Sequence, residues 1–238
     1  MIGCVNGKLL IFYPVDWRAN QQTNLTQQND NKWGGRLIPP LHRKQGEMMS
    51  DDTRQVFQLC SYLLNYPDHE WIDSLIEVEE EVEYLASSPM KDELLQFCQG
   101  AKKKSAAAIL STYVNTFDFG KKTNLYVTYM SSGEQRERGM DLLFLKNYYK
   151  LQGFSVTDKE LPDYLPIMLE FASLVDEEKI KPVFERYFEN IKEIEKHLID
   201  ANNLYHHILS ACLRALEDAG VTKAVRRSEE ICSTSFYG

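Results

Sequence analysis

The sequence predicts an all-α protein, a single multi-helix bundle of about eight or nine helices. Two observations support this fold class. Apolar residues recur at spacings of three and four along most of the chain after Ser50, as they do on the buried faces of helices. No alternating apolar run is flanked by the Asn-Gly or Asp-Gly turns typical of hairpins, so strands are not expected. With 238 residues, 43% of them hydrophobic, the chain can bury one sizeable core.

The first 47 residues differ in composition from the rest. A Gln/Asn-rich polar tract covers residues 20–32, and paired glycines and paired prolines follow it. This tract offers too little apolar surface to offset the entropy of ordering, so residues 1–47 are predicted to be a disordered tail. Because helical periodicity begins only after Met48-Met49, the alternative, which we favour, is that translation starts there and residues 1–47 are a mis-assigned extension. An all-helical domain is then expected over residues 48–222, with a flexible tail over 223–238.

Four helices are expected in the first half of the helical region. A Ser50 cap begins the first, and the run Asn65-Tyr66-Pro67 ends it. The second has an acidic outer face over residues 77–83, opposite its apolar positions. Ser88-Pro89 begins the third, since proline suits the first helical position, and Gly100 is expected to stop it. The fourth is marked by Ile109, Leu110, Tyr113, Val114 and Phe117.

The second half continues with helical periodicity. A short helix is expected over residues 124–130, and longer helices over 140–153, 165–172, 180–198 and 204–220. Glycine ends the helices at 140–153 and 204–220, because it tolerates the left-handed conformation that commonly follows a helix. The apolar face predicted for the helix at 140–153 consists of Met140, Leu143, Phe144 and Tyr148.

Charge and cysteine usage narrow the classes of function. The formal net charge is −8, although residues 1–47 carry six Lys/Arg against three Asp/Glu, so the helical part is strongly acidic. An acidic surface repels nucleic acid and anionic lipid and favours a basic partner, although it also serves solubility alone. The five cysteines form no Cys-x-x-Cys pair, which predicts neither a zinc site nor a disulfide framework. No apolar run reaches the roughly 18 residues that span a bilayer, so a cytoplasmic protein without direct membrane insertion is expected.

Candidate catalytic and metal-binding groups are sparse. His206 and His207 are adjacent, so on a helix they should point about 100° apart and not share one ion. His197 with Glu193 is half of a carboxylate–histidine site, but the chain has no Glu-x-x-His motif for a di-iron centre. Arg136 and Arg138 are expected to be solvated or to form an ion pair at a helix start, more often than to bind phosphate. The residues therefore predict no catalytic site, no metal and no cofactor.

The segment 161–171 has two interpretations. Its two prolines flank Asp163, Tyr164 and Leu165, hold the chain extended and then begin a helix, which places a carboxylate near the positive end of the helix dipole. On residue types alone, Asp163 is an N-cap and its two neighbours pack in the core. The alternative is a recognition site, because binding residues are often found where loops meet a rigid bundle.

Four motifs lie between residues 113 and 171. They are YVNTFD at 113–118, KTNLYVTY at 122–129, GEQRERG at 133–139 and ELPDYLPIMLEF at 160–171. Their order and spacing resemble those of the NarJ-type nitrate reductase assembly chaperones, which belong to the TorD-like family. The resemblance extends from about Thr53 to about Ala215 and is specific in this middle third. Tyr164 stands where the wider family commonly has histidine, which removes any argument from a titrating imidazole.

The resemblance implies a function in binding. A NarJ-type chaperone would hold the immature catalytic α subunit of respiratory nitrate reductase by its N-terminal segment, and would not be part of the finished enzyme. While bound, it would allow insertion of the molybdenum cofactor and an iron–sulfur cluster before membrane docking. Molybdenum cofactor biosynthesis proteins are a second expected class of partner. The residues expected to line or brace the peptide groove are Tyr113, Phe117, Tyr126, Asp163, Tyr164, Leu165, Glu170 and Phe171.

Two other functions remain open on the sequence. One is a TorD-like chaperone for a different molybdoenzyme, such as a sulfoxide or amine-oxide reductase. The other is a helical enzyme with an unrecognised site, although the chain shows no nucleophile and base at a meaningful spacing. An acidic bundle rich in aromatic and methionine side chains, with 13 Tyr, 11 Phe and 7 Met, favours the binding of a basic amphipathic peptide.

Overall fold

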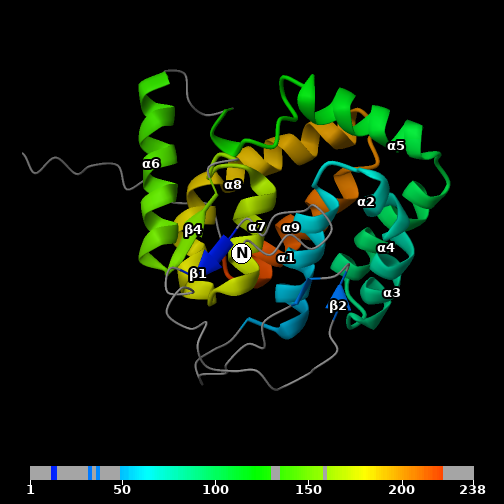
Figure 1. Cartoon of the computed structure of the whole chain (residues 1–238), viewed down its shortest axis with the longest axis horizontal. Helices are drawn as coiled ribbons and strands as arrows, with labels where there is room; N and C mark the ends of the chain where they lie inside the picture. The colour runs from blue at the N-terminus through cyan, green and yellow to red at the C-terminus, as the bar shows by residue number, and fades with distance from the viewer. Residues whose placement is uncertain are drawn as a thin grey trace, which may run out of the picture.

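Helices dominate the part of the chain that the computed structural model describes, which is residues 12–14, 32–33, 36–37, 49–129, 135–157 and 160–221 (Figure 1). This architecture confirms the all-α prediction. The helices are α1 (Asp51–Leu63), α2 (His69–Asp73), α3 (Leu75–Tyr84), α4 (Pro89–Lys102), α5 (Ala106–Tyr113), α6 (Gln135–Leu151), α7 (Leu165–Leu174), α8 (Glu177–Asp200) and α9 (His206–Asp218). No helix in these ranges has the length and apolar composition to cross a membrane.

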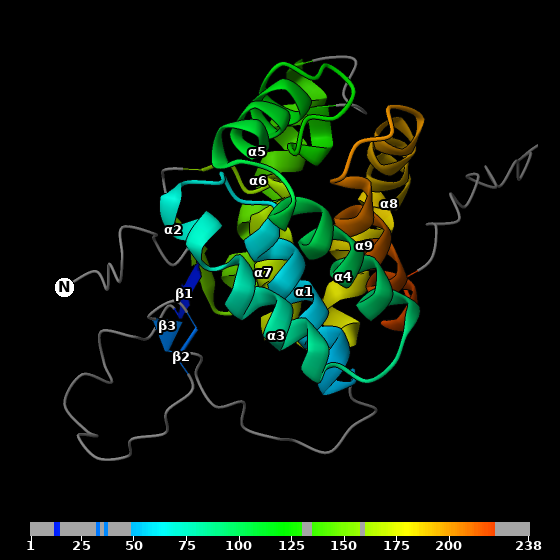
Figure 2. The same ribbon diagram turned by 90° about the vertical axis from the view of Figure 1, so that its right-hand side faces the viewer.

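Helices α1 and α9 lie at the centre of the bundle (Figure 2). Helix α1 packs on α7 and α9, and α9 packs in addition on α4 and α8. The side chains between them are apolar and buried, which is the main favourable term in folding. They include Phe57, Leu63, Phe97, Phe184 and Leu216. Helix α6 lies at one edge of the molecule, away from this centre (Figure 1).

The predicted start of the first helix is confirmed, whereas the second predicted helix is two helices. The backbone amide of Thr53 donates to the Ser50 hydroxyl at 3.0 Å, so Ser50 caps α1. The second apolar run is divided at Ser74 into α2 and α3. The Ser74 hydroxyl donates to the carbonyl of Trp71 at 2.8 Å, a local bond that competes with the regular helix pattern.

The prediction that Gly100 stops a helix is wrong. Helix α4 continues through it to Lys102. A Cβ atom at Gly100 would lie 2.4 Å from Cδ1 of Leu204, so the glycine allows the segment before α9 to approach α4 closely. The fourth predicted helix is α5, which continues as a π-helical turn over Val114–Asp118.

The predicted apolar face of α6 is wrong at two of its four residues, whereas Phe144 and Tyr148 pack against the core as predicted. Met140 and Leu143 are 65% and 59% exposed, whereas Leu145 and Tyr149 are fully buried. Because α6 packs at the edge of the bundle, it buries a narrow stripe, and the periodicity alone did not identify which stripe. The short helix expected over 124–130 is only a 3-10 turn, Val127–Tyr129, and Met130 lies outside the described residues.

The prediction that no strands form is wrong in detail. Strand β1 (Phe12–Pro14) pairs antiparallel with β4 (Phe154–Val156), and β2 (Lys32–Trp33) pairs with β3 (Arg36–Leu37). Strands of two or three residues are too short to show an alternating pattern, so the apolar periodicity could not predict them. The rest of the predicted N-terminal tail at 1–47, and the predicted C-terminal tail at 223–238, lie outside the described residues.

Candidate functional site

Two motif segments that are far apart in the sequence pair with each other. Residues 125–127 run antiparallel to residues 163–165, with backbone hydrogen bonds of 3.0 and 2.8 Å between them. Tyr126 and Tyr164 face each other in this isolated bridge, and the centroids of their rings lie 5.2 Å apart. We call this pair of segments the tyrosine bridge. It connects the chain before α6 to the chain that begins α7.

The carboxylate of Asp163 lies beneath the tyrosine bridge and is fully buried. Its Oδ2 accepts a hydrogen bond from the Thr128 hydroxyl at 2.6 Å and lies 3.7 Å from Nη2 of Arg138. Nε of Arg138 donates in turn to the Thr128 hydroxyl at 3.3 Å. These two partners offset part of the cost of burying a charge. Oδ1 has no hydrogen-bond partner among the residues that the structure describes.

The N-cap interpretation of Asp163 is therefore wrong. Helix α7 begins one residue later than that interpretation requires, so Tyr164 is the N-cap, and no side chain caps the helix. The Asp163 carboxylate instead holds the 3-10 turn and α6 against the start of α7. Arg138, expected to be solvated or paired at a helix start, forms this ion pair from the first turns of α6.

An aromatic cluster supports the inner side of the tyrosine bridge. Tyr113 is buried, and its hydroxyl donates to the carbonyl of Leu64 at 3.0 Å and lies 3.2 Å from the Tyr164 hydroxyl. The ring of Phe117 lies 4.9 Å from that of Tyr113, edge to face. Burial, followed by the proximity of Tyr113, raises the pKa of the Tyr164 phenol, which therefore stays neutral at physiological pH.

Two carboxylates form an acidic rim beside the bridge. The Tyr126 hydroxyl donates to Oε2 of Glu160 at 2.7 Å. Glu160 and the exposed Asp118 both lie near enough to Tyr164 to add to the burial effect that raises its pKa. Within the described ranges, neither carboxylate forms an ion pair with a Lys or Arg. We call these two carboxylates, Asp118 and Glu160, the acidic rim.

The eight predicted site residues differ in how far their side chains are buried. Tyr126, Tyr164 and Glu170 are partly exposed. Five are buried and can only support the surface: Tyr113, Phe117, Asp163, Leu165 and Phe171. Phe171 lies among the rings of Tyr148, Tyr149 and Phe154, and Tyr149 connects this group to the bridge by donating to the carbonyl of Pro162 at 3.1 Å.

Several residues at this surface were missed by sequence reasoning. The ring of Tyr66 is 50% exposed and lies 5.7 Å from that of Tyr113, although the sequence marked it only as part of a helix stop. Phe119 is 76% exposed directly after Asp118. Thr128 belonged to a recognised motif, but nothing in its type indicated a bond to Asp163. Exposed aromatic side chains beside an acidic rim are suited to an amphipathic basic segment.

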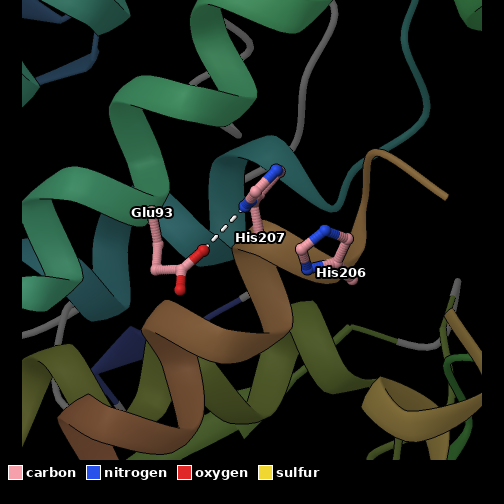
Figure 3. A group of neighbouring side chains, drawn as sticks. All are labelled: Glu93, His206 and His207. Atoms are coloured by element: carbon pink, nitrogen blue, oxygen red, sulfur yellow. Dashed lines mark hydrogen bonds and ion pairs between the residues drawn. The ribbon is translucent and has the colours of Figure 1, made fainter. Parts of the chain in front are cut away.

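The prediction that the side chains of His206 and His207 point away from each other is wrong. The centroids of their rings lie 3.8 Å apart, and both approach the Glu93 carboxylate (Figure 3). Nε2 of His197 lies 3.6 Å from Oε1 of Glu193, as its spacing of four residues indicates.

Comparisons with known proteins find a matching family and several relatives. A family model described as nitrate reductase delta subunit matches residues 85–207. The probable nitrate reductase molybdenum cofactor assembly chaperone NarJ of Bacillus subtilis is 44% identical over 178 residues, which cover 75% of this chain and 97% of that protein. The corresponding chaperone NarJ of Escherichia coli is 29% identical over 117 residues, 48% of this chain and 50% of that protein. The nitrate reductase-like protein NarX of Mycobacterium tuberculosis is 29% identical over 159 residues, 67% of this chain and 24% of that protein.

Proposed function

The chain belongs to the nitrate reductase delta subunit family, with the NarJ-type assembly chaperones, and on that premise we propose that it binds the N-terminal segment of the nitrate reductase α subunit. The relatives are named as assembly chaperones, and the chain is accordingly a chaperone and not an enzyme. Its client is held in the cytoplasm while the molybdenum cofactor and an iron–sulfur cluster are inserted, before the client docks on its membrane anchor. The chaperone then leaves the finished enzyme.

One observation carries this proposal: the acidic rim of Asp118 and Glu160 lies beside partly exposed aromatic side chains. A basic amphipathic helix places its apolar side chains three or four residues apart, and a surface with Tyr66, Tyr126 and Tyr164 offers them aromatic contact area. Its basic side chains then meet the rim carboxylates. Charge complementarity of this kind acts mainly on the association rate and on the choice of partner.

The buried residues give this surface its shape. Asp163 connects the 3-10 turn to α6, and Tyr113 supports the Tyr164 ring from beneath. Ordering these groups before the client binds removes part of the entropy cost of association. In this proposal, Asp163 positions the binding surface and does not contact the client.

A peptide titration tests the proposal. A synthetic peptide of the α-subunit N-terminus is titrated into the full chain by calorimetry. Replacing both rim carboxylates, Asp118→Asn with Glu160→Gln, is expected to weaken binding at least about tenfold, because each charge-assisted hydrogen bond contributes about 1.5–3 kcal/mol. The matched control is Glu77→Gln with Glu80→Gln, which removes the same charge from the exposed face of α3.

The control separates a local rim from a general acidic field. If both double variants lose the same affinity, net charge alone attracts the peptide, and the assignment of the rim is wrong. The N-terminal peptides of a sulfoxide reductase and an amine-oxide reductase are titrated in the same way. Tighter binding of either peptide than of the nitrate reductase peptide would indicate that the client is a different molybdoenzyme.

A further inference from the structure

Helices α4 and α9 approach closely at one end of their contact. Gly100 on α4 leaves space for Leu204, which precedes α9, and Glu93 lies about two turns earlier on α4. Helix α9 begins with His206 and His207, directly after the Tyr205 N-cap. The packing of α4 on α9 therefore brings one carboxylate and two imidazoles together from two central helices.

The three side chains converge on a small space (Figure 3). Nδ1 of His207 lies 2.7 Å from Oε2 of Glu93, and the centroids of the two histidine rings lie 3.8 Å apart, with the ring planes tilted by 39°. One ligand atom from each residue lies within 4.8 Å of the other two. This convergence is what the adjacency of the two histidines in the sequence did not predict.

One of these groups is buried without a partner. Nδ1 of His206 has no hydrogen bond to any residue in the described ranges and is shielded from water. Buried polar atoms are usually bonded, so an unbonded one calls for a physical reason.

We propose that Glu93, His206 and His207 form a binding site for a divalent transition-metal ion of the zinc class. Two imidazoles and one carboxylate are a ligand set that Zn²⁺ accepts, with water in the fourth position. Imidazole favours Zn²⁺, Cu²⁺ or Ni²⁺ over Mg²⁺ and Ca²⁺, which prefer oxygen ligands.

The site needs only small side-chain movements to bind the ion. Nitrogen and oxygen atoms about 2.0–2.1 Å from a tetrahedral Zn²⁺ lie about 3.3 Å from each other. The present separations, which are all within 4.8 Å, must therefore change by about 1.5 Å or less, and the 2.7 Å contact between Glu93 and His207 widens. Each histidine binds the ion through an unprotonated ring nitrogen, so a proton on that nitrogen is displaced to the other ring nitrogen or to solvent as the ion enters. The bound ion then connects α4 to α9, which pack on each other.

Direct binding of the metal alone tests this site in the full chain. Zn²⁺ is titrated by calorimetry against a chelator of known affinity, and Co²⁺ is followed by its visible absorption. Glu93→Gln and His206→Ala are each expected to weaken Zn²⁺ binding at least about tenfold and to reduce the Co²⁺ absorption. The matched control His69→Ala, which removes an exposed histidine of α2, should change affinity less than about twofold.

Two outcomes would overturn the proposal. In one, the chain binds no Zn²⁺ that competes with the chelator. In the other, Zn²⁺ binds, but Glu93→Gln and His206→Ala bind it as the parent does, so the ion is held by other groups. The glutamine in Glu93→Gln can still accept a hydrogen bond from His207, which lets this variant keep its fold while losing the metal-binding charge. Circular dichroism of each metal-free variant confirms the fold before titration.

Discussion

The tyrosine bridge and the α4–α9 junction both place polar side chains inside a helical bundle, but they use them differently. At the bridge, the buried Asp163 has a hydroxyl and a guanidinium beside it, supplied by two other segments of the chain. At the junction, Glu93 and His207 pair with each other, and Nδ1 of His206 has no partner in the part of the chain that the structure describes.

This difference distinguishes polar groups that support the fold from polar groups that are suited to binding a partner. Polar groups that are paired across segments distant in the sequence fix the position of those segments, so changing them should alter stability first. The exposed or partly exposed carboxylates of the acidic rim, and Nδ1 of His206, which has no hydrogen bond within the described ranges, can take new partners without unfolding the chain. Their loss should therefore alter binding first.

The largest expected effect on stability is at Asp163. Replacing it with alanine should lower the free energy of unfolding by about 2–3 kcal/mol, because Thr128 and Arg138 lose their acceptor. The partial exposure of Arg138 limits the loss, since water can solvate the guanidinium. Urea denaturation measures the change.

Asp176 is the control for that substitution. It is 67% exposed and lies 3.2 Å from Arg54, so Asp176→Ala should cost less than about 1 kcal/mol. Arg54 keeps the carbonyls of Ser173 and Val175 as acceptors in this variant. Equal losses in the two variants would show that the buried Asp163 is no more important to stability than the exposed Asp176.

Alkaline pH should also weaken the bridge. Burial raises the pKa of Tyr113 well above its ordinary value of 10.0, so the folded state keeps this proton when the unfolded state has lost it. Its stabilising effect is complete below pH 10 and decreases as the pH rises above it, by up to about 1.4 kcal/mol per pH unit. Tyr113→Phe should flatten this decrease in urea denaturation series. Tyr84→Phe, at a position 83% exposed, should not.

Two glycines give the smallest effects, with opposite signs. Gly100→Ala places a Cβ 2.4 Å from Leu204 at the α4–α9 junction and should cost about 1 kcal/mol as that side chain moves. Gly139→Ala on α6 meets no atom within 4 Å and should stabilise the protein by about 0.5–1 kcal/mol, because alanine favours a helix. Thermal denaturation of both variants compares them. A stabilising Gly100→Ala would contradict the close approach at the junction.

The sequence predicted the elements that depend on local chemistry. The Ser50 cap, the proline that begins α4 and the left-handed Gly153 and Gly220 that follow α6 and α9 each depend on one residue and its neighbours. The motif residues near the bridge were also identified, because their resemblance to a family could be recognised from short stretches.

Contacts between distant segments could not be predicted. The continuation of α4 through Gly100 depends on Leu204, which lies more than a hundred residues later. The burial of Leu145 and Tyr149 in place of Met140 and Leu143 depends on where α6 packs. The role of Asp163 needed Thr128 and Arg138 to be placed beside it, and an aspartate before a helix is more often a cap.

The most direct test of the proposed function is capture of the newly made client. The α subunit of nitrate reductase is synthesised in a cell-free system and passed over the immobilised full chain, with and without its N-terminal segment. The full-length subunit should be retained, and the subunit that lacks this segment should not. Equal retention of the two forms, or retention that is unchanged by Asp118→Asn with Glu160→Gln, would contradict the proposal that the acidic rim binds the N-terminal segment.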